Sequence, residues 1–152
     1  QARRSQVVLR SGGRPGDLLF VTGRLGGSRR GRHLSFTPRL AEAEWLTGNF
    51  KVHAMMDLSD GLARDLPRLA SASECGYLLE SESVPRSRGV TVEQALRDGE
   101  DYELLLAVSK YTAKRLVGSW SDQFPGLPLT AIGSLTSEGQ PALVGGWDHF
   151  AA

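Results

Sequence analysis

Two carboxylate-bearing segments have the residue types for chemistry, and the first runs from Asp57 to Gly61. Asp57 and Asp60 lie three residues apart and flank the hydroxyl of Ser59. The segment precedes a helical pattern, and a helix start suits phosphate because its backbone N–H groups are unpaired. Magnesium is bound by carboxylate, water and phosphate oxygens. The segment therefore predicts a phosphate–magnesium site, unless Ser59 and Asp60 only cap the helix, a contribution of about 1 kcal/mol.

The second acidic segment, Asp98 to Glu103, holds four acids within six residues. Such carboxylates repel one another unless they are solvated or bound to cations. The segment is therefore either a solvated turn between a helix and a strand or part of a cation-binding site. Near the chain end, Trp147 follows two glycines. Its ring would stack on an aromatic ligand, especially a cationic one, or would pin the terminus to the core.

Familiar sequence signatures of other chemistries are absent. The chain has no phosphate loop of the form G-x-x-x-x-G-K-[ST] and no dinucleotide-binding G-x-G-x-x-G. It has neither H-E-x-x-H nor G-x-S-x-G, and its three histidines lie far apart. A single cysteine, Cys75, excludes an internal disulfide and a cysteine-based zinc cluster. The two acidic segments and Trp147 thus remain as the candidate functional residues.

Length and composition indicate one domain with a substantial core. The chain has 152 residues, of which 40% are hydrophobic and 23% are charged, so it lacks the composition of a disordered protein. No apolar run approaches the roughly 18 residues needed to span a membrane. No secretory leader is visible at the start of the sequence. These features predict a soluble, cytoplasmic protein.

Charge is distributed unevenly along the chain. The first 50 residues hold nine basic and three acidic side chains, whereas the rest holds nine basic and fourteen acidic ones. Arg29, Arg30 and Arg32 form the densest basic group. This part is expected to be a solvated basic loop or a face toward an acidic partner domain, or else to bind an anion such as a nucleotide. The lack of interleaved aromatic residues argues against nucleic acid.

Hydrophobic periodicity and turn residues predict alternating strands and helices around the acidic segments. A helical pattern over 61–73 directly follows the first segment. Thr91 and Gln94 form a capping-box pattern that opens a short helix ahead of the second segment. Pro38, with Thr37 as its cap, is expected to open an earlier helix. The alternation predicts an α/β or α+β fold in which helices cover a sheet. The predicted strands are 18–22, 52–56, 77–79, 102–108, 129–132 and 142–144, and the predicted helices are 38–48, 61–73, 92–98 and 110–120.

Three segments taken together resemble the thiamine-monophosphate kinase family. They are AMMDLSDGLARDL at 54–66, GEDYELL at 99–105 and GWDHF at 146–150, in the order in which the family has them. RSGGRPGD at 10–17 and VTG at 21–23 are similar to the start of the family's second domain. The resemblance implies an α+β fold with a mixed β-sheet flanked by helices, like the C-terminal domain of the aminoimidazole ribonucleotide synthetase superfamily. It covers nearly the whole chain, residues 1–152 as a single domain, but only the C-terminal half of the usual two-domain enzyme.

The resemblance also implies an activity. The family transfers the γ-phosphate of ATP to thiamine monophosphate, giving thiamine diphosphate and ADP in a direct, Mg²⁺-assisted step. No side chain is expected to act as a covalent catalyst, because phosphoryl transfer depends mainly on positioning and charge neutralisation. The implied site residues are Asp57 and Asp60 as metal ligands, Ser59 and Arg10 at ATP, and Glu100 and Trp147 at thiamine monophosphate.

In that family the N-terminal half supplies most of the metal-binding aspartates, much of the ATP site and the dimer-forming strands. With that ATP- and metal-binding domain absent, the isolated chain is expected to be close to inactive. The full-length protein is expected to be a homodimer without nucleic-acid or membrane partners. One alternative is another ATP-dependent enzyme of the superfamily, which would keep Asp57 and Asp60 but not use Trp147 on its acceptor. The other alternative is a non-catalytic binding or scaffold domain.

Overall fold

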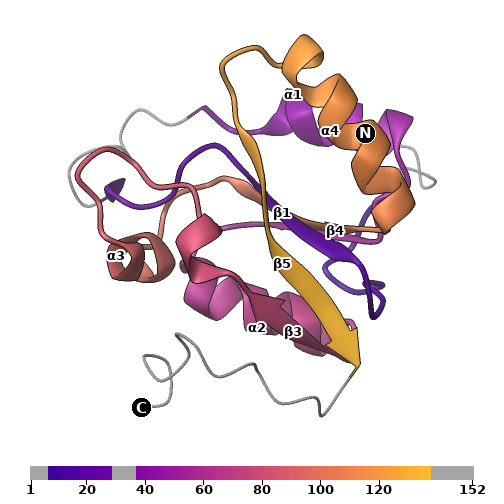
Figure 1. Cartoon of the computed structure of the whole chain (residues 1–152), viewed down its shortest axis with the longest axis horizontal. Helices are drawn as coiled ribbons and strands as arrows, with labels where there is room; N and C mark the ends of the chain where they lie inside the picture. Colours follow the sequence, from indigo (N-terminus) through magenta and orange to yellow (C-terminus); the bar gives the residue numbers. More distant parts are fainter. Residues whose placement is uncertain (1–6, 29–36, 138–152) are drawn as a thin grey trace.

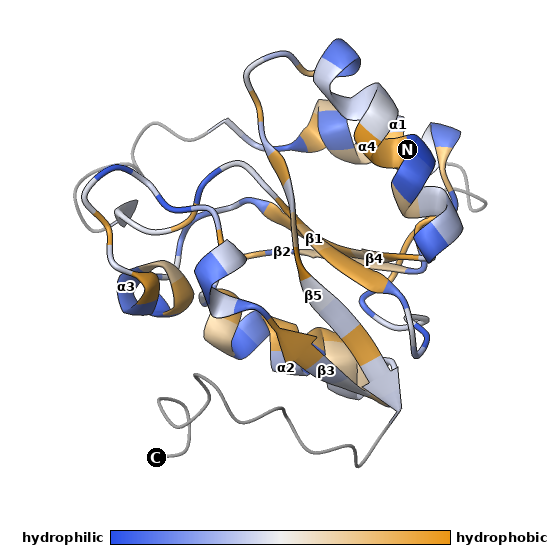
Figure 2. Cartoon of the chain, in the orientation of Figure 1, coloured by the Kyte–Doolittle hydropathy of each residue, from blue (hydrophilic) through white to orange (hydrophobic). Residues whose placement is uncertain are grey.

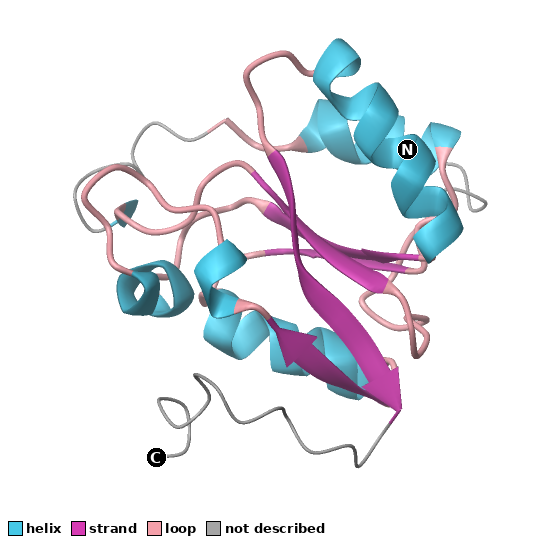
Figure 3. Cartoon of the chain, viewed as in Figure 1, coloured by secondary structure: helices cyan, strands magenta, loops and turns pink. Residues whose placement is uncertain are grey.

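Strands and helices form where short apolar runs and helical stripes alternate in the sequence. The computed structural model describes residues 7–28 and 37–137, and Figures 1 and 3 show the strands crossing between helices on both sides. The elements in chain order are β1 (Leu18–Thr22), α1 (Leu40–Asn49), β2 (Ala54–Asp57), α2 (Leu62–Ala72), β3 (Cys75–Leu79), η4 (Ser81–Ser83), α3 (Val92–Arg97), β4 (Leu104–Val108), α4 (Lys110–Gln123) and β5 (Leu129–Ser137).

The sheet has the strand order β2-β4-β1-β5-β3. Every neighbouring pair among these five strands is antiparallel. In the register, Asp57 at the end of β2 lies opposite Leu104 at the start of β4. Val21, near the end of β1, lies opposite Leu105. The segments that follow β1 and β2 therefore lie at the same end of the sheet as the segment that precedes β4.

Alternate residues of each strand contribute to two separate cores on the two faces of the sheet. Leu19 and Val21 of β1 pack with α2 and α3, whereas Phe20 packs with α1 and α4. All five residues of β4 are buried because helices cover both faces of that strand. Figure 2 shows the same arrangement as hydrophobic strands between helices that carry hydrophilic residues. Burial on both faces fixes β4, and with it the segment just before β4, between β2 and β1.

The α+β class and the helices flanking the sheet are confirmed, and two details differ from the expectation. The five strands form an antiparallel sheet rather than a mixed one, and the isolated parallel bridge, between Leu25 and Arg86, lies outside the strands. Helix α1 begins at Leu40, and the residue at its N-cap is Arg39 without a side-chain cap bond, so Thr37 is not the cap. The guanidinium of Arg39 is bound by the carboxylate of Glu103, the residue just before β4.

The capping box that opens α3 is present as predicted. The backbone N–H of Gln94 donates to the Thr91 hydroxyl at 3.2 Å, and the Thr91 N–H donates to the Gln94 side chain at 3.0 Å. The predicted strand at 142–144 lies outside the described residues. Within residues 7–28 and 37–137, no helix has the length and apolar character required to cross a lipid bilayer.

We expect the free energy of unfolding to fall as the pH rises from about 10 to about 12, because burial raises the pKa of Tyr77 from 10.0 to about 12. The unfolded chain ionises this phenol first, so deprotonation favours unfolding across that interval. Tyrosinate absorbance during an alkaline titration measures the effect. Tyr77→Phe should remove the most alkaline step, whereas Tyr111→Phe, at a side chain that is 73% exposed, should not. A Tyr77 that ionises together with Tyr111 would contradict the prediction.

Candidate functional site

The two acidic segments meet at the end of the sheet where β2 ends and β4 begins. Three backbone hydrogen bonds join them. The N–H of Leu58 donates to the carbonyl of Glu103 at 2.8 Å, and the N–H of Tyr102 donates to the carbonyl of Leu58 at 2.9 Å. Further along, the N–H of Glu100 donates to the carbonyl of Ser59 at 2.8 Å. The backbones of residues 57–60 and 100–103 thus lie side by side, although 39 residues separate the two segments in the sequence.

Two glycines permit this close approach. A Cβ atom on Gly61 would lie 2.9 Å from the carbonyl oxygen of Asp98, and Gly61 has a φ of +93° that other residues rarely adopt. A Cβ atom on Gly99 would lie 2.8 Å from the carbonyl oxygen of Ser59. Real Cβ atoms essentially never approach backbone oxygens this closely. The glycine in each segment therefore leaves room for the backbone of the other segment.

Two acids of the second segment hold the loop that follows β1. The carboxylate of Asp101, which is only 4% exposed, accepts from the N–H of Gly26 at 2.9 and 3.1 Å. The carboxylate of Asp98 accepts from the N–H of Gly27 at 3.0 Å. These bonds tie a third chain segment to the same end of the sheet. The alternative of a solvated turn is therefore wrong for Asp101 and Asp98, whose negative charges are satisfied by the protein's own backbone.

Glu103 is the most deeply buried acid of the segment, at 1% exposure. Its two carboxylate oxygens accept from Nε and Nη2 of Arg39 at 2.7 and 2.8 Å, and Oε2 also accepts from the Thr22 hydroxyl at 2.7 Å. The hydrogen bond and charge of Glu103 raise the pKa of Arg39. A two-pronged arginine–carboxylate pair fixes geometry as well as charge. It anchors the start of α1 to the start of β4.

Glu100 differs from the other three acids. Its side chain is exposed and makes no hydrogen bond or ion pair with the part of the chain that the structure describes. Its backbone has a φ of +62°, a left-handed conformation that is uncommon for a residue with a side chain. Tyr102, two residues later, also has a positive φ, of +50°. The backbone of this segment is thus held in a strained form that leaves the Glu100 carboxylate in solvent.

Asp57, Ser59 and Asp60 lie beside Glu100 on the turn between β2 and α2. Asp57 is exposed and has no partner among residues 7–28 and 37–137. The Asp60 carboxylate is bound by Arg68, and this hydrogen bond and charge lower the pKa of Asp60. Neither Ser59 nor Asp60 caps α2, whose N-cap is Gly61 without a side-chain cap bond. The helix-cap alternative is therefore wrong, and the turn carries its oxygen groups for another reason.

The donor chemistry of this turn fits magnesium. Asp57 and Asp60 supply carboxylate oxygens at one end of the sheet, and Mg²⁺ is usually held by one or two carboxylates together with water and substrate phosphates. Within the described residues, no group of three or more His, Cys, Asp or Glu side chains is arranged to hold a metal ion.

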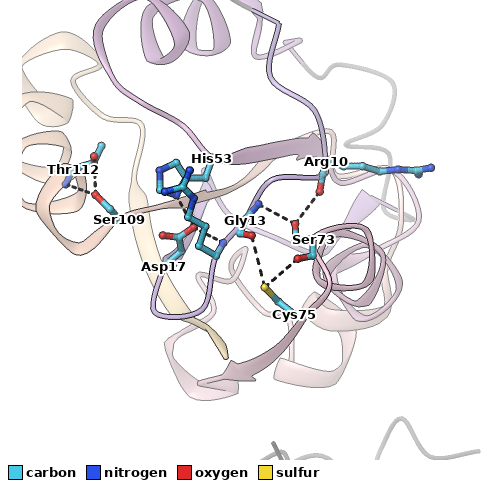
Figure 4. A network of polar contacts seen from close by, with 9 residues as sticks. Arg10, Gly13, Asp17, His53, Ser73, Cys75, Ser109 and Thr112 are labelled. Carbon is cyan, nitrogen blue, oxygen red and sulfur yellow. Dashed lines mark hydrogen bonds and ion pairs between the residues drawn. The ribbon is translucent and has the colours of Figure 1, made fainter. Parts of the chain in front are cut away.

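Arg10 lies on the segment that runs beside β2. The N–H of Met55 donates to the carbonyl of its neighbour Leu9 at 2.9 Å, and the Arg10 carbonyl accepts from the Ser73 hydroxyl at 3.4 Å, at the C-terminal end of α2. Figure 4 shows the Arg10 side chain pointing away from the polar network around Ser73 and Asp17. The backbone hydrogen bonds thus bring the segment from Asp57 to Asp60 alongside Glu100, and Arg10 remains a proposed member of the site. Trp147 lies outside the described residues.

The buried polar partners around the site were not found in the sequence analysis. Arg39 and Glu103 are 64 residues apart, and no local pattern predicts their pairing. Asp65 and Arg68 could have been found, because side chains three residues apart on a helix lie side by side. In the helical pattern over 61–73 both residues fall opposite the apolar stripe, a position that predicts exposure to solvent. The structure shows that Asp65 is fully buried.

The chain is similar to one family and to several of its members. Residues 27–146 match the family described as AIR synthase related protein, C-terminal domain. A thiamine-monophosphate kinase from Rhodopirellula baltica is 40% identical over 141 residues, which cover 86% of this chain and 43% of that protein. The similarity confirms the resemblance to thiamine-monophosphate kinases. The chain spans about half the length of the curated relatives that it matches.

Solved structures agree with the sequence similarity. The thiamine-monophosphate kinase from Stenotrophomonas maltophilia K279a has a TM-score of 0.78 and 27% identity, covering 93% of this chain and 54% of that one. AaThiL complexed with AMPPCP and TMP has a TM-score of 0.65 and 30% identity, covering 89% of this chain and 49% of that one. The fold described above is therefore that of about half of each of these proteins.

We expect Gly61→Ala to reduce the free energy of unfolding by roughly 1–3 kcal/mol, because the new Cβ would meet backbone oxygens of the second acidic segment at a strained φ. Gly48→Ala is the matched control. Gly48 lies inside α1 with nothing within 4 Å of an added Cβ, so the change should stabilise the protein by about 0.5–1 kcal/mol. Urea unfolding followed by circular dichroism measures both. Equal effects of the two substitutions would contradict the close approach of the segments.

Proposed function

The chain belongs to the AIR synthase related protein, C-terminal domain family, and we propose that it is the C-terminal part of an ATP-dependent kinase that converts thiamine monophosphate to thiamine diphosphate. The observation that carries this proposal is the backbone pairing of the two acidic segments. It brings the segment from Asp57 to Asp60 alongside Glu100. These residues belong to the same segments that resemble thiamine-monophosphate kinases, and a relative of that name is 40% identical to the chain.

The proposed roles follow from the chemistry of each side chain. Asp57 and Asp60 would hold Mg²⁺, which neutralises phosphate charge when it is bound. The Ser59 hydroxyl, between the two carboxylates, would donate a hydrogen bond to ATP. The exposed carboxylate of Glu100 would hold the cationic thiazolium of thiamine monophosphate. Arg10 at the nucleotide phosphates and Trp147 against the rings of thiamine monophosphate are parts of the same proposal.

The reaction requires positioning more than covalent chemistry. The bond between the γ-phosphorus of ATP and its bridging oxygen breaks, and a terminal oxygen of thiamine monophosphate forms the new bond to phosphorus. The products are ADP and thiamine diphosphate. The residues of this chain would hold the two phosphate groups near each other and offset their repulsion. The AMPPCP and TMP complex of AaThiL, which is 30% identical to this chain, supports binding of a nucleotide and a second ligand by this fold.

The rest of the active site would come from a further part of a longer protein. The chain covers only 43% of the Rhodopirellula baltica relative, and we propose that an N-terminal ATP- and metal-binding domain completes the enzyme. The basic side chains of the first 50 residues would then face that domain and its bound phosphates. A homodimeric, cytoplasmic full-length protein without nucleic-acid or membrane partners belongs to the same proposal.

Titration calorimetry with thiamine diphosphate tests the acceptor site on the complete two-domain protein. We expect binding that depends on Mg²⁺ and that weakens roughly ten- to 150-fold in Glu100→Ala, since a hydrogen-bonded charge in a site contributes about 1.5–3 kcal/mol. Glu93→Ala is the matched control, because Glu93 is an exposed glutamate of α3 that pairs with Arg97 at 3.7 Å. Trp147→Ala should also weaken binding.

Three results of that titration and of a parallel titration with ATP and Mg²⁺ would contradict the acceptor assignment. Binding that Glu100→Ala leaves unchanged would move the acceptor away from this turn. Binding of ATP with Mg²⁺ but not of thiamine diphosphate would instead favour another ATP-dependent enzyme of the superfamily with a different acceptor. Binding of neither ligand would favour a scaffold domain.

A steady-state kinase assay on the isolated 152 residues tests whether the chain is only one part of the active site. We expect turnover far below that of ordinary enzymes, because ATP and Mg²⁺ would have too few ligands. Addition of the N-terminal domain in the same polypeptide should restore activity. Turnover of about 1 s⁻¹ or more by the isolated chain would show that it contains a complete site.

A further inference from the structure

The carboxylate of Asp65 is completely buried in the first turn of α2. A buried charge is tolerated only when it is paired or hydrogen-bonded. Its Oδ2 accepts from the backbone N–H of Asp60 at 2.9 Å, and its Oδ1 accepts from Nη1 of Arg68 at 3.0 Å. Both oxygens of Asp65 therefore bind groups that belong to the turn before α2 or to the next turn of the helix.

Arg68 bridges this buried carboxylate and the candidate metal ligand. The same Nη1 that binds Asp65 also donates to Oδ2 of Asp60. The Arg68 and Asp60 side chains are 47% and 46% exposed, so solvent and ions reach this pair, whereas Asp65 is inaccessible. Asp60 is thus held at two points, by Asp65 at its backbone N–H and by Arg68 at its carboxylate. Asp57, the second candidate ligand, has no such partner among the described residues.

We propose that Arg68, anchored on Asp65, is a positioning residue that acts as the internal counter-ion of Asp60: it holds the carboxylate in place and releases it when a divalent cation binds. The inference rests on the proposed function, in which Asp60 is a metal ligand. A guanidinium and a metal ion are both cations, so they compete for the Asp60 carboxylate. Arg68 keeps its bond to Asp65 after that release, so its charge stays beside the site.

This arrangement predicts a gain of metal affinity on removal of the arginine. Arg68→Gln removes a positive charge that both occupies Asp60 and repels a divalent cation. Like charges so close together repel each other, and salt screens only part of that repulsion. The expected result is a roughly three- to tenfold tighter binding of the metal. A role limited to holding the turn together would predict weaker binding or no change.

The experiment is a titration of the complete two-domain protein with Mn²⁺, followed by paramagnetic broadening of the backbone amide resonances of Asp60 and Gly61. Arg68→Gln should lower the midpoint of broadening roughly three- to tenfold. Arg68→Lys, which retains the charge, should keep the midpoint within about twofold of the wild type. Arg86→Gln is the matched control, since it removes the same charge from an exposed pair with Glu82 whose N–O distance is 3.9 Å.

An unchanged or raised midpoint in Arg68→Gln would overturn the proposal. The same conclusion holds if Arg86→Gln lowers the midpoint equally, because the effect would then be one of net charge. Absence of broadening at Asp60 in both the wild type and Arg68→Gln would overturn it as well. Failure of the proposed function has a separate signature: the complete protein would not bind thiamine diphosphate, whereas the Mn²⁺ titration uses neither thiamine nor nucleotide.

Discussion

The position of β4 between β2 and β1, antiparallel to both, is the constraint on which the candidate site depends. Antiparallel pairing places the end of each neighbour beside the start of β4. The segments after β1, after β2 and before β4 therefore converge at one end of the sheet. The two helix layers bury β4 on both faces and hold its register, because a shift would disrupt the close packing of its side chains in both cores. Site geometry is in this sense a product of core packing.

The acids at that end of the sheet serve two different purposes. Asp101 and Glu103 are buried and bound by backbone N–H groups, a hydroxyl and an arginine. Loss of one partner from such a buried pair typically costs about 3–5 kcal/mol, far more than loss of an exposed pair. Asp57 and Glu100 are exposed and leave their charges available to ligands. The cluster of like charges is tolerated because the charges of Asp101 and Glu103 are neutralised inside the protein. The same buried bonds fix the backbone that carries the exposed Asp57 and Glu100.

Local patterns predicted the elements well, and long-range contacts accounted for what was missed. The apolar run of β1 and the capping box of α3 were confirmed because each depends on neighbouring residues. Strand order and the antiparallel ladders depend on pairings between distant segments, which local patterns do not show, and the mixed sheet that the family resemblance implied is wrong. The burial of Asp101 was missed because its partner Gly26 lies 75 residues away. That Asp57, Ser59, Asp60 and Glu100 belong to one site was expected only through the family resemblance.

At position 100, backbone conformation and ligand recognition favour different residues. A non-glycine residue in a sparsely populated conformation costs of the order of 1–3 kcal/mol. Glycine would adopt the same φ without strain, but it would remove the exposed carboxylate. Selection for thermal stability alone would therefore drive this position toward glycine, whereas selection for ligand recognition would retain the acid. In a directed-evolution experiment the residue recovered at position 100 would report which of these two pressures the library had experienced.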